Sequence, residues 1–87
     1  MTTPERLRDL LAKEFAIEPA RLVPGARLED LDIDSLRMIE IAFAVEDAFG
    51  VKIDDEPAQL MARIRTLADF AAYVEGLPAA PSPQPAR

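Results

Sequence analysis

The residues of this chain that could do chemistry gather in one short stretch, LEDLDIDSLRMIE, residues 28–40. Asp30, Asp32 and Asp34 alternate there, as the first ligands of a calcium-binding loop do. Ser35 follows at the start of an apolar segment, where the N-terminus of a helix would expose its hydroxyl. The two patterns predict different sites, either a cation held by carboxylates or a serine presented for modification.

The calcium pattern fails at two positions. In a loop that starts at Asp30, position 6 is Ser35, where the sharp turn needs Gly, and position 12 is Ile41, where a bidentate Glu is needed. The loop would also consume a stretch with helical periodicity. We therefore expect no dedicated metal site, although clustered carboxylates permit loose binding of a divalent cation at the surface.

The plain interpretation of Asp34-Ser35-Leu36 is that Asp34 or Ser35 caps the helix that follows. Asp and Ser are both preferred at that position, and a given tripeptide occurs by chance in many proteins. On these three residues alone, capping is favoured over modification. The elements around Ser35 must therefore decide its role.

Length and composition limit the chemistry of the rest of the chain. Its 87 residues are enough for one domain with a modest helical core, and they include no Cys, His or Trp. Thiol nucleophiles, imidazole bases and thiolate or imidazole metal sites are thereby excluded. A binding or carrier module is favoured over an enzyme.

Charge and hydropathy limit the partners. The net charge of −6 argues against a nucleic acid as partner. The acidic residues are concentrated in one region, since residues 29–56 hold ten acids and only two bases, Arg37 and Lys52. No apolar run is long enough to cross a bilayer, and the N-terminus MTTPERLRDL lacks the apolar segment of a signal peptide. We expect a cytoplasmic monomer that does not insert into membranes.

Apolar periodicity predicts an all-α fold, an up-and-down four-helix bundle without strands. The first two helices are expected at about residues 4–16, with Thr3 as N-cap, and at 35–49, with Gly50 as C-cap. A short third helix is expected at 56–63. The fourth is expected at 67–75, after a capping box that begins at Thr66. The long connection 17–34 should turn its apolar side chains inward: Leu22, Val23, Leu28, Leu31 and Ile33. Residues 1–76 form the expected domain, and residues 77–87 form a Pro-rich tail predicted to be disordered.

The second helix has more apolar surface than one core contact needs. At 100° per residue, one apolar face comprises Met38, Ile41, Ala42, Val45 and Phe49, and a second strip comprises Leu36, Ile39 and Phe43 beside the acidic face. The first face is expected to point inward. The second strip is expected to remain available to a partner.

Residues 17–53 resemble the acyl carrier protein family. A Pro-punctuated loop leads through LEDL into Asp34-Ser35-Leu36, and an apolar helix with Glu40 follows, ending in Glu46-Asp47-Ala48-Phe49-Gly50. The closing helix with Tyr73 extends the resemblance to about residues 4–75. Three features depart from the family pattern: Asp32 where Gly is frequent, Arg37 where fatty-acid carriers have an acid, and a third helix about two residues longer.

The resemblance implies that Ser35 receives 4′-phosphopantetheine from coenzyme A, through a separate magnesium-dependent phosphopantetheinyl transferase. Asp34 and Leu36 flank this attachment site. An acyl group would then be held as a thioester and presented to acyl-transferring and acyl-modifying enzymes with basic docking patches. We expect docking through Leu36, Arg37, Glu40, Phe43, Asp47, Asp54, Asp55 and Glu56, and we expect the acyl chain to enter among the inward residues, at Met38 first.

The sequence leaves the cargo and pathway open. The departures at Asp32 and Arg37 argue against the housekeeping fatty acid pathway, so another lipid or a polyketide is an alternative. A carrier of aminoacyl or peptidyl groups is a second possibility on the same fold. A third is a helical interaction domain that is never modified.

Overall fold

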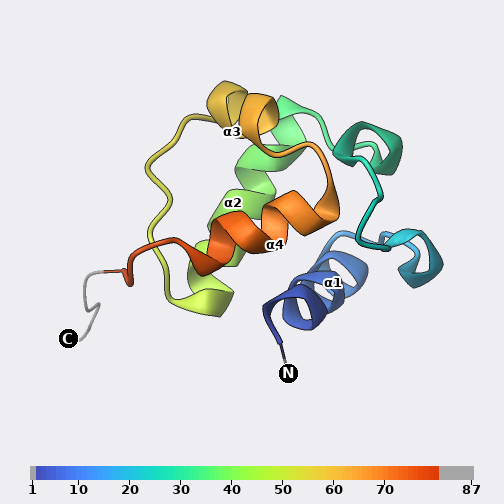
Figure 1. The fold of residues 1–87 in the computed structure, drawn as a ribbon, viewed down its shortest axis with the longest axis horizontal. Helices are drawn as coiled ribbons and strands as arrows, with labels where there is room; N and C mark the ends of the chain where they lie inside the picture. Colours follow the sequence, from blue (N-terminus) through green and yellow to red (C-terminus); the bar gives the residue numbers. More distant parts are fainter. Residues whose placement is uncertain (1, 81–87) are drawn as a thin grey trace.

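The computed structural model describes residues 2–80 and contains four α-helices within that range (Figure 1). They are α1 (Thr3–Glu14), α2 (Ser35–Phe49), α3 (Pro57–Arg63) and α4 (Leu67–Glu75). These residues include no strand, and their only β-type pairings are two isolated bridges, Arg27 to Thr66 and Val51 to Ala79. The predicted all-α bundle with a short third helix is confirmed.

The first helix begins and ends slightly earlier than predicted. Its N-cap is Thr2, not Thr3: the Thr2 hydroxyl accepts the Glu5 N–H at 3.3 Å, and the Glu5 carboxylate accepts the Thr2 N–H at 2.9 Å. Helix α1 ends at Glu14 because Ala16 has a left-handed backbone with φ of 55°, which a right-handed helix does not allow.

The hydrophobic core draws on all four helices and on the long connection between α1 and α2. Helix α4 buries four side chains: Leu67, Phe70, Ala71 and Val74. The connection buries Leu22, Leu28, Leu31 and Ile33 as predicted. Val23 was predicted wrongly: it is 51% exposed, because it begins the turn closed by the Ala26 N–H on the Val23 carbonyl at 2.9 Å.

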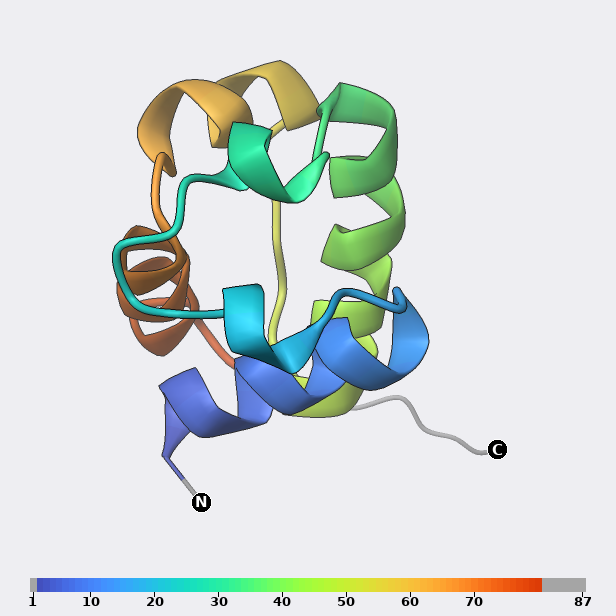
Figure 2. The same ribbon diagram turned by 90° about the vertical axis from the view of Figure 1, so that its right-hand side faces the viewer.

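The long connection is held against the start of α4, which fixes where α2 begins. The Leu28 N–H bonds the Arg65 carbonyl at 3.0 Å, and in return the Leu67 N–H bonds the Ala26 carbonyl at 2.9 Å. Two short 3₁₀ turns, Pro19–Arg21 and Leu28–Leu31, add local structure. Figure 2 shows this segment, in cyan to green, crossing the side of the bundle from α1 to the start of α2.

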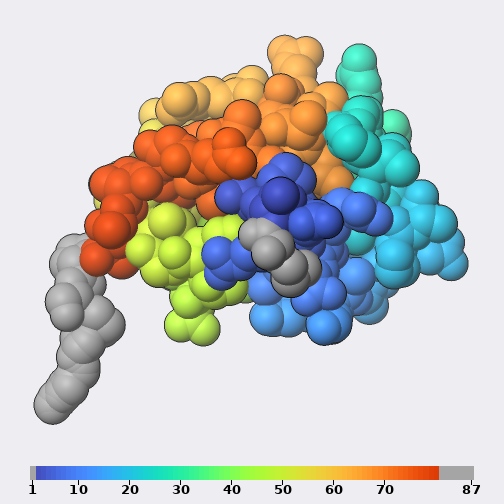
Figure 3. All heavy atoms as spheres, turned by 60° about the horizontal axis from the view of Figure 1, so that its bottom comes forward, coloured from blue at the N-terminus to red at the C-terminus, as the bar shows by residue number. Residues whose placement is uncertain are grey.

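The opposite end of α2 packs on α1. The Arg6 guanidinium donates to the Ala48 carbonyl at 2.8 Å and lies over the Phe49 ring, 4.3 Å from its centroid. Figure 3 shows the blue N-terminal helix beside the yellow-green end of α2 and the orange-red α4. None of the helices in residues 2–80 has both the length and the hydropathy to span a membrane.

Residues 78–80 are paired with the link that follows α2, and the Leu77 N–H bonds the Val74 carbonyl at 3.1 Å. The Lys52 N–H bonds the Pro78 carbonyl at 3.1 Å, and the Ala80 N–H bonds the Gly50 carbonyl at 2.9 Å. The predicted tail therefore begins too early, because its first four residues have backbone partners in the domain. The rest of that prediction, residues 81–87, lies outside the described residues.

Candidate functional site

Ser35 is the first residue of α2 and is exposed to solvent. The N-cap is Asp34, whose carboxylate accepts the Arg37 N–H at 2.8 Å. Since Asp34 provides the cap, the Ser35 hydroxyl is not required for it, and within residues 2–80 that hydroxyl makes no hydrogen bond. The structure thus decides between the two candidate caps and leaves the serine available for reaction.

The backbone around Ser35 suits an anion. The N–H groups of Ser35 and Leu36 have no acceptor among the described residues, and they lie at the positive end of a 15-residue helix. A phosphate joined to the Ser35 oxygen would lie where such groups stabilise negative charge. The Asp34 carboxylate, although close, is already hydrogen-bonded to the helix N-terminus.

The three alternating acids do not form a cation site. Asp32 has a left-handed backbone with φ of 61° and ends the Leu28–Leu31 turn. Over residues 2–80, no group of three or more carboxylates is placed to hold a metal ion.

Arg37 lies two residues after Ser35 on α2 and faces an acid on its own helix. Its Nε is 3.8 Å from the Glu40 carboxylate, and its guanidinium is 5.9 Å from the centroid of the Phe15 ring. Both members of the pair are exposed. Arg37 therefore reduces the negative potential of α2 at the serine end. Asp47, further along the helix, is exposed and makes no ion pair within residues 2–80.

The outer strip of α2 is exposed, as predicted. Leu36 is 69% exposed, Phe43 is 68% exposed, and Ile39 between them is 38% exposed. Neighbouring exposed apolar side chains of this kind are typical of interaction surfaces. An open hollow of about 560 Å³ continues it beyond Phe43, lined also by Asp47, Lys52 and Ala80.

The inner face of α2 has the predicted orientation. Met38, Ile41 and Val45 are completely buried, and Ala42 and Phe49 are partly buried against the core. These residues form the packed interior of the bundle. That an acyl chain enters among them stays a prediction.

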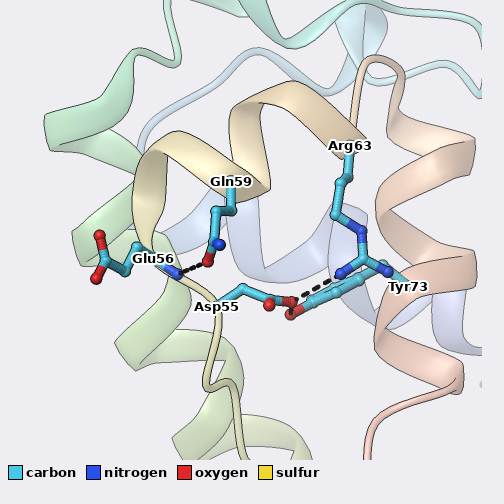
Figure 4. Close-up of polar contacts among 5 residues, drawn as sticks. All are labelled: Asp55, Glu56, Gln59, Arg63 and Tyr73. Atoms are coloured by element: carbon cyan, nitrogen blue, oxygen red, sulfur yellow. Dashed lines mark hydrogen bonds and ion pairs between the residues drawn. The ribbon is translucent and has the colours of Figure 1, made fainter.

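The three acids that follow α2 do not act alike. Asp54 and Glu56 are exposed, as a docking surface requires. Asp55 is half-buried and accepts hydrogen bonds from the Tyr73 hydroxyl at 2.7 Å and from Arg63 at 3.1 Å (Figure 4). Its charge is thus paired within the domain, and its predicted place in the docking surface stays a prediction.

This contact was missed because Arg63 and Tyr73 are 8 and 18 residues from Asp55 in sequence. In the sequence, Tyr73 stands out only through the family resemblance. Burial, and then the hydrogen bond to Asp55, raise the pKa of Tyr73 to about 12. The Tyr73 hydroxyl therefore remains protonated, and able to donate, at neutral pH.

Comparison with known proteins agrees with this site. Residues 5–74 match the family described as a phosphopantetheine attachment site, which defines the class as a carrier domain. The meromycolate extension acyl carrier protein of Mycolicibacterium aurum is 43% identical over 72 residues, which cover 82% of this chain and 71% of that protein. The protein of the same name from Mycobacterium tuberculosis is 42% identical over 72 residues, covering 82% of this chain and 60% of that protein.

The chain belongs to the acyl carrier protein family. It is a carrier and not an enzyme, and its cofactor is 4′-phosphopantetheine. Its partners are a phosphopantetheinyl transferase and acyl-handling enzymes. The exposed hydroxyl and the free N–H groups at the start of α2 fit such a group.

Proposed function

We propose that Ser35 is the attachment point of 4′-phosphopantetheine and that the chain carries a long acyl group for extension. The observation that supports the attachment point is the exposed Ser35 hydroxyl at the start of α2, left free because Asp34 caps the helix. The proposed cargo is supported by the relatives, which are named meromycolate extension acyl carrier proteins.

The attachment reaction needs little from this chain beyond an accessible hydroxyl. The Ser35 oxygen forms a bond to the phosphorus that bears the pantetheine arm of coenzyme A, the phosphoanhydride bond breaks, and adenosine bisphosphate leaves. The hydroxyl proton passes to a base of the transferase. The bound group supplies the thiol that holds the acyl chain as a thioester, which suits a chain without Cys or His.

Intact mass tests the attachment point directly. Incubation with coenzyme A and a phosphopantetheinyl transferase should add the mass of one phosphopantetheine to the wild type and none to Ser35→Ala. Thr3→Ala is the matched control, because Thr3 holds the first helical position of α1 as Ser35 does in α2. Modification of Ser35→Ala would refute the assignment.

The cargo is tested with the loaded protein. We expect fatty acyl extension enzymes to use its long-chain thioester, and we expect amino-acid-adenylating enzymes not to load it. Loading by an adenylating enzyme instead would favour the aminoacyl carrier.

We propose that partner enzymes dock on the outer strip of α2 through charge and a small apolar contact. Leu36 and Phe43 supply the apolar part, and Glu40 and Asp47, with Asp54 and Glu56, supply the negative field. Brief contacts with several enzymes depend more on steering by charge than on tight binding, so the partners should present basic patches. Arg37 then favours partners with an acid opposite it.

Charge reversal tests this docking surface. Glu40→Lys with Asp47→Lys should slow acyl transfer strongly at low salt, and the difference from wild type should narrow at high salt, because salt screens the attraction. Asp9→Lys with Glu75→Lys makes the same change in net charge on α1 and α4 and should have little effect. Equal rates for wild type and the α2 variant at low salt would exclude docking by charge.

A further inference from the structure

Three side chains from three segments meet at one carboxylate oxygen. Asp55, in the link between α2 and α3, accepts both the Tyr73 hydroxyl of α4 at 2.7 Å and the Arg63 guanidinium of α3 at 3.1 Å on its Oδ2 atom (Figure 4). The Arg63 guanidinium also lies 5.6 Å from the centroid of the Tyr73 ring. The cluster therefore joins the two ends of α3 to α4.

Helix α3 packs mainly against α2 and has few buried side chains of its own. It has seven residues and buries a single side chain, Leu60, with Ile64 buried just after its end. A helix this short is not stable by itself and depends on its tertiary contacts. Its N-terminus is closed by the Gln59 side chain, which accepts the Glu56 N–H at 2.9 Å, but this contact is internal to the helix and does not fix its position.

The position of α3 matters because it lies beside the serine end of α2. Both Figure 1 and Figure 2 show α3 next to the first turns of α2, where Ser35 is the first residue. The completely buried Met38 and the buried Leu60 and Ile64 belong to the same core cluster. An acyl chain that starts from Ser35 would reach this cluster most directly between α2 and α3.

We propose that Asp55, Arg63 and Tyr73 form a latch that holds α3 against α4 and sets how readily the bundle opens between α2 and α3 to admit the acyl chain. The role in admission rests on the function proposed above. The contacts of the latch are present in the unmodified protein and do not depend on that function.

The chemistry of the cluster suits a contact that opens repeatedly. Arg63 is exposed and Asp55 is half-buried, so water can replace their interaction at low cost. The Tyr73 hydroxyl, whose pKa is raised to about 12, donates to Asp55 throughout the neutral range. Arg63 is the last residue of α3, so the length of this helix places its guanidinium over Tyr73.

Amide hydrogen exchange of the unmodified protein tests the latch. Asp55→Ala and Tyr73→Phe should each speed exchange at Leu60 and Arg63 roughly five- to tenfold, while amides in the middle of α2 keep their protection. Asp54→Ala is the matched control, because it removes a neighbouring exposed acid outside the cluster and should leave α3 unchanged. Unchanged exchange of α3 in both latch variants would overturn the proposal.

The single tyrosine offers a second readout. The chain has one Tyr and no Trp, so phenolate absorbance reports Tyr73 alone. The titration midpoint of Tyr73 should lie near 12 in the wild type. In Asp55→Ala it should move toward 10 but stay above it, because the ring is still partly buried. In Asp54→Ala it should barely move. A midpoint that is the same in the wild type and in Asp55→Ala would overturn the latch.

The acyl-loaded protein tests the role in admission. Compared with wild type, Tyr73→Phe should show larger acyl-dependent NMR shifts at the Leu60 and Ile64 methyl groups, because opening costs less. Equal NMR shifts in both proteins would overturn the proposal that the latch controls entry of the acyl chain. If Ser35 proved not to be the attachment point, the exchange and titration results would still stand, so the two failures are distinguishable.

Discussion

Helices α2 and α3 lie side by side but are held in different ways. Helix α2 has 15 residues, three completely buried side chains, a side-chain N-cap at Asp34 and a left-handed Gly50 with φ of 65° at its end. Helix α3 has seven residues and one buried side chain, and polar contacts join it to α4. Apolar burial resists opening, whereas exposed polar contacts exchange readily with water.

This difference separates two tasks within one small domain. Helix α2, with the proposed attachment and docking residues, is fixed by the core. Helix α3 packs on α2 and is joined to α4 by exposed polar contacts, which we propose open at low cost. The following predictions test that contrast, beginning with the largest expected effect.

Truncation of a buried side chain of α2 should have the largest effect. Ile41→Ala removes a completely buried side chain and should lower the free energy of unfolding by about 2–5 kcal/mol, because it loses apolar burial and leaves a cavity. Ile39→Ala, on the 38% exposed side of the same helix, should cost about 1 kcal/mol or less. Denaturant unfolding measures both, and similar losses for the two variants would contradict the assigned inner face.

Loss of the α2 cap should have an intermediate effect. Asp34→Ala removes the acceptor of the Arg37 N–H and should lower the free energy of unfolding by about 1 kcal/mol. Ser35→Ala should change it by less than about 0.5 kcal/mol, since the serine is exposed and is not the cap. A larger loss for Ser35→Ala than for Asp34→Ala would mean that the serine itself caps the helix.

Alkaline pH should have the smallest effect, because Tyr73 remains partly exposed. The pKa of Tyr73 is raised from 10.0 to about 12 in the folded protein, so its stabilising contribution is complete below about pH 10 and is lost as pH rises through about 12. The free energy of unfolding of wild type, measured against Tyr73→Phe, should fall across that range. A constant difference between them would contradict the buried, hydrogen-bonded hydroxyl.

Local sequence signals predicted the helices and the candidate serine well. The Pro- and Gly-marked boundaries, the capping box at Thr66 and Asp69 and the 3.6-residue periodicity of α2 act over a few residues, so they could be located without a structure. The exposed strip of Leu36, Ile39 and Phe43 followed from the same periodicity. Errors in these predictions were small, such as the N-cap of α1 and the orientation of Val23.

The sequence by itself thus determined an all-α bundle and a serine at the start of its second helix, because capping and periodicity depend on near neighbours. Only the tertiary structure decided which acids are free. Asp54, Asp55 and Glu56 are equivalent in sequence, yet Asp55 alone is paired, since folding brings Arg63 and Tyr73 to it. The pairing of residues 78–80 with residues 50–52 was decided in the same way. Contacts between distant segments depend on how the helices pack, which no local pattern specifies.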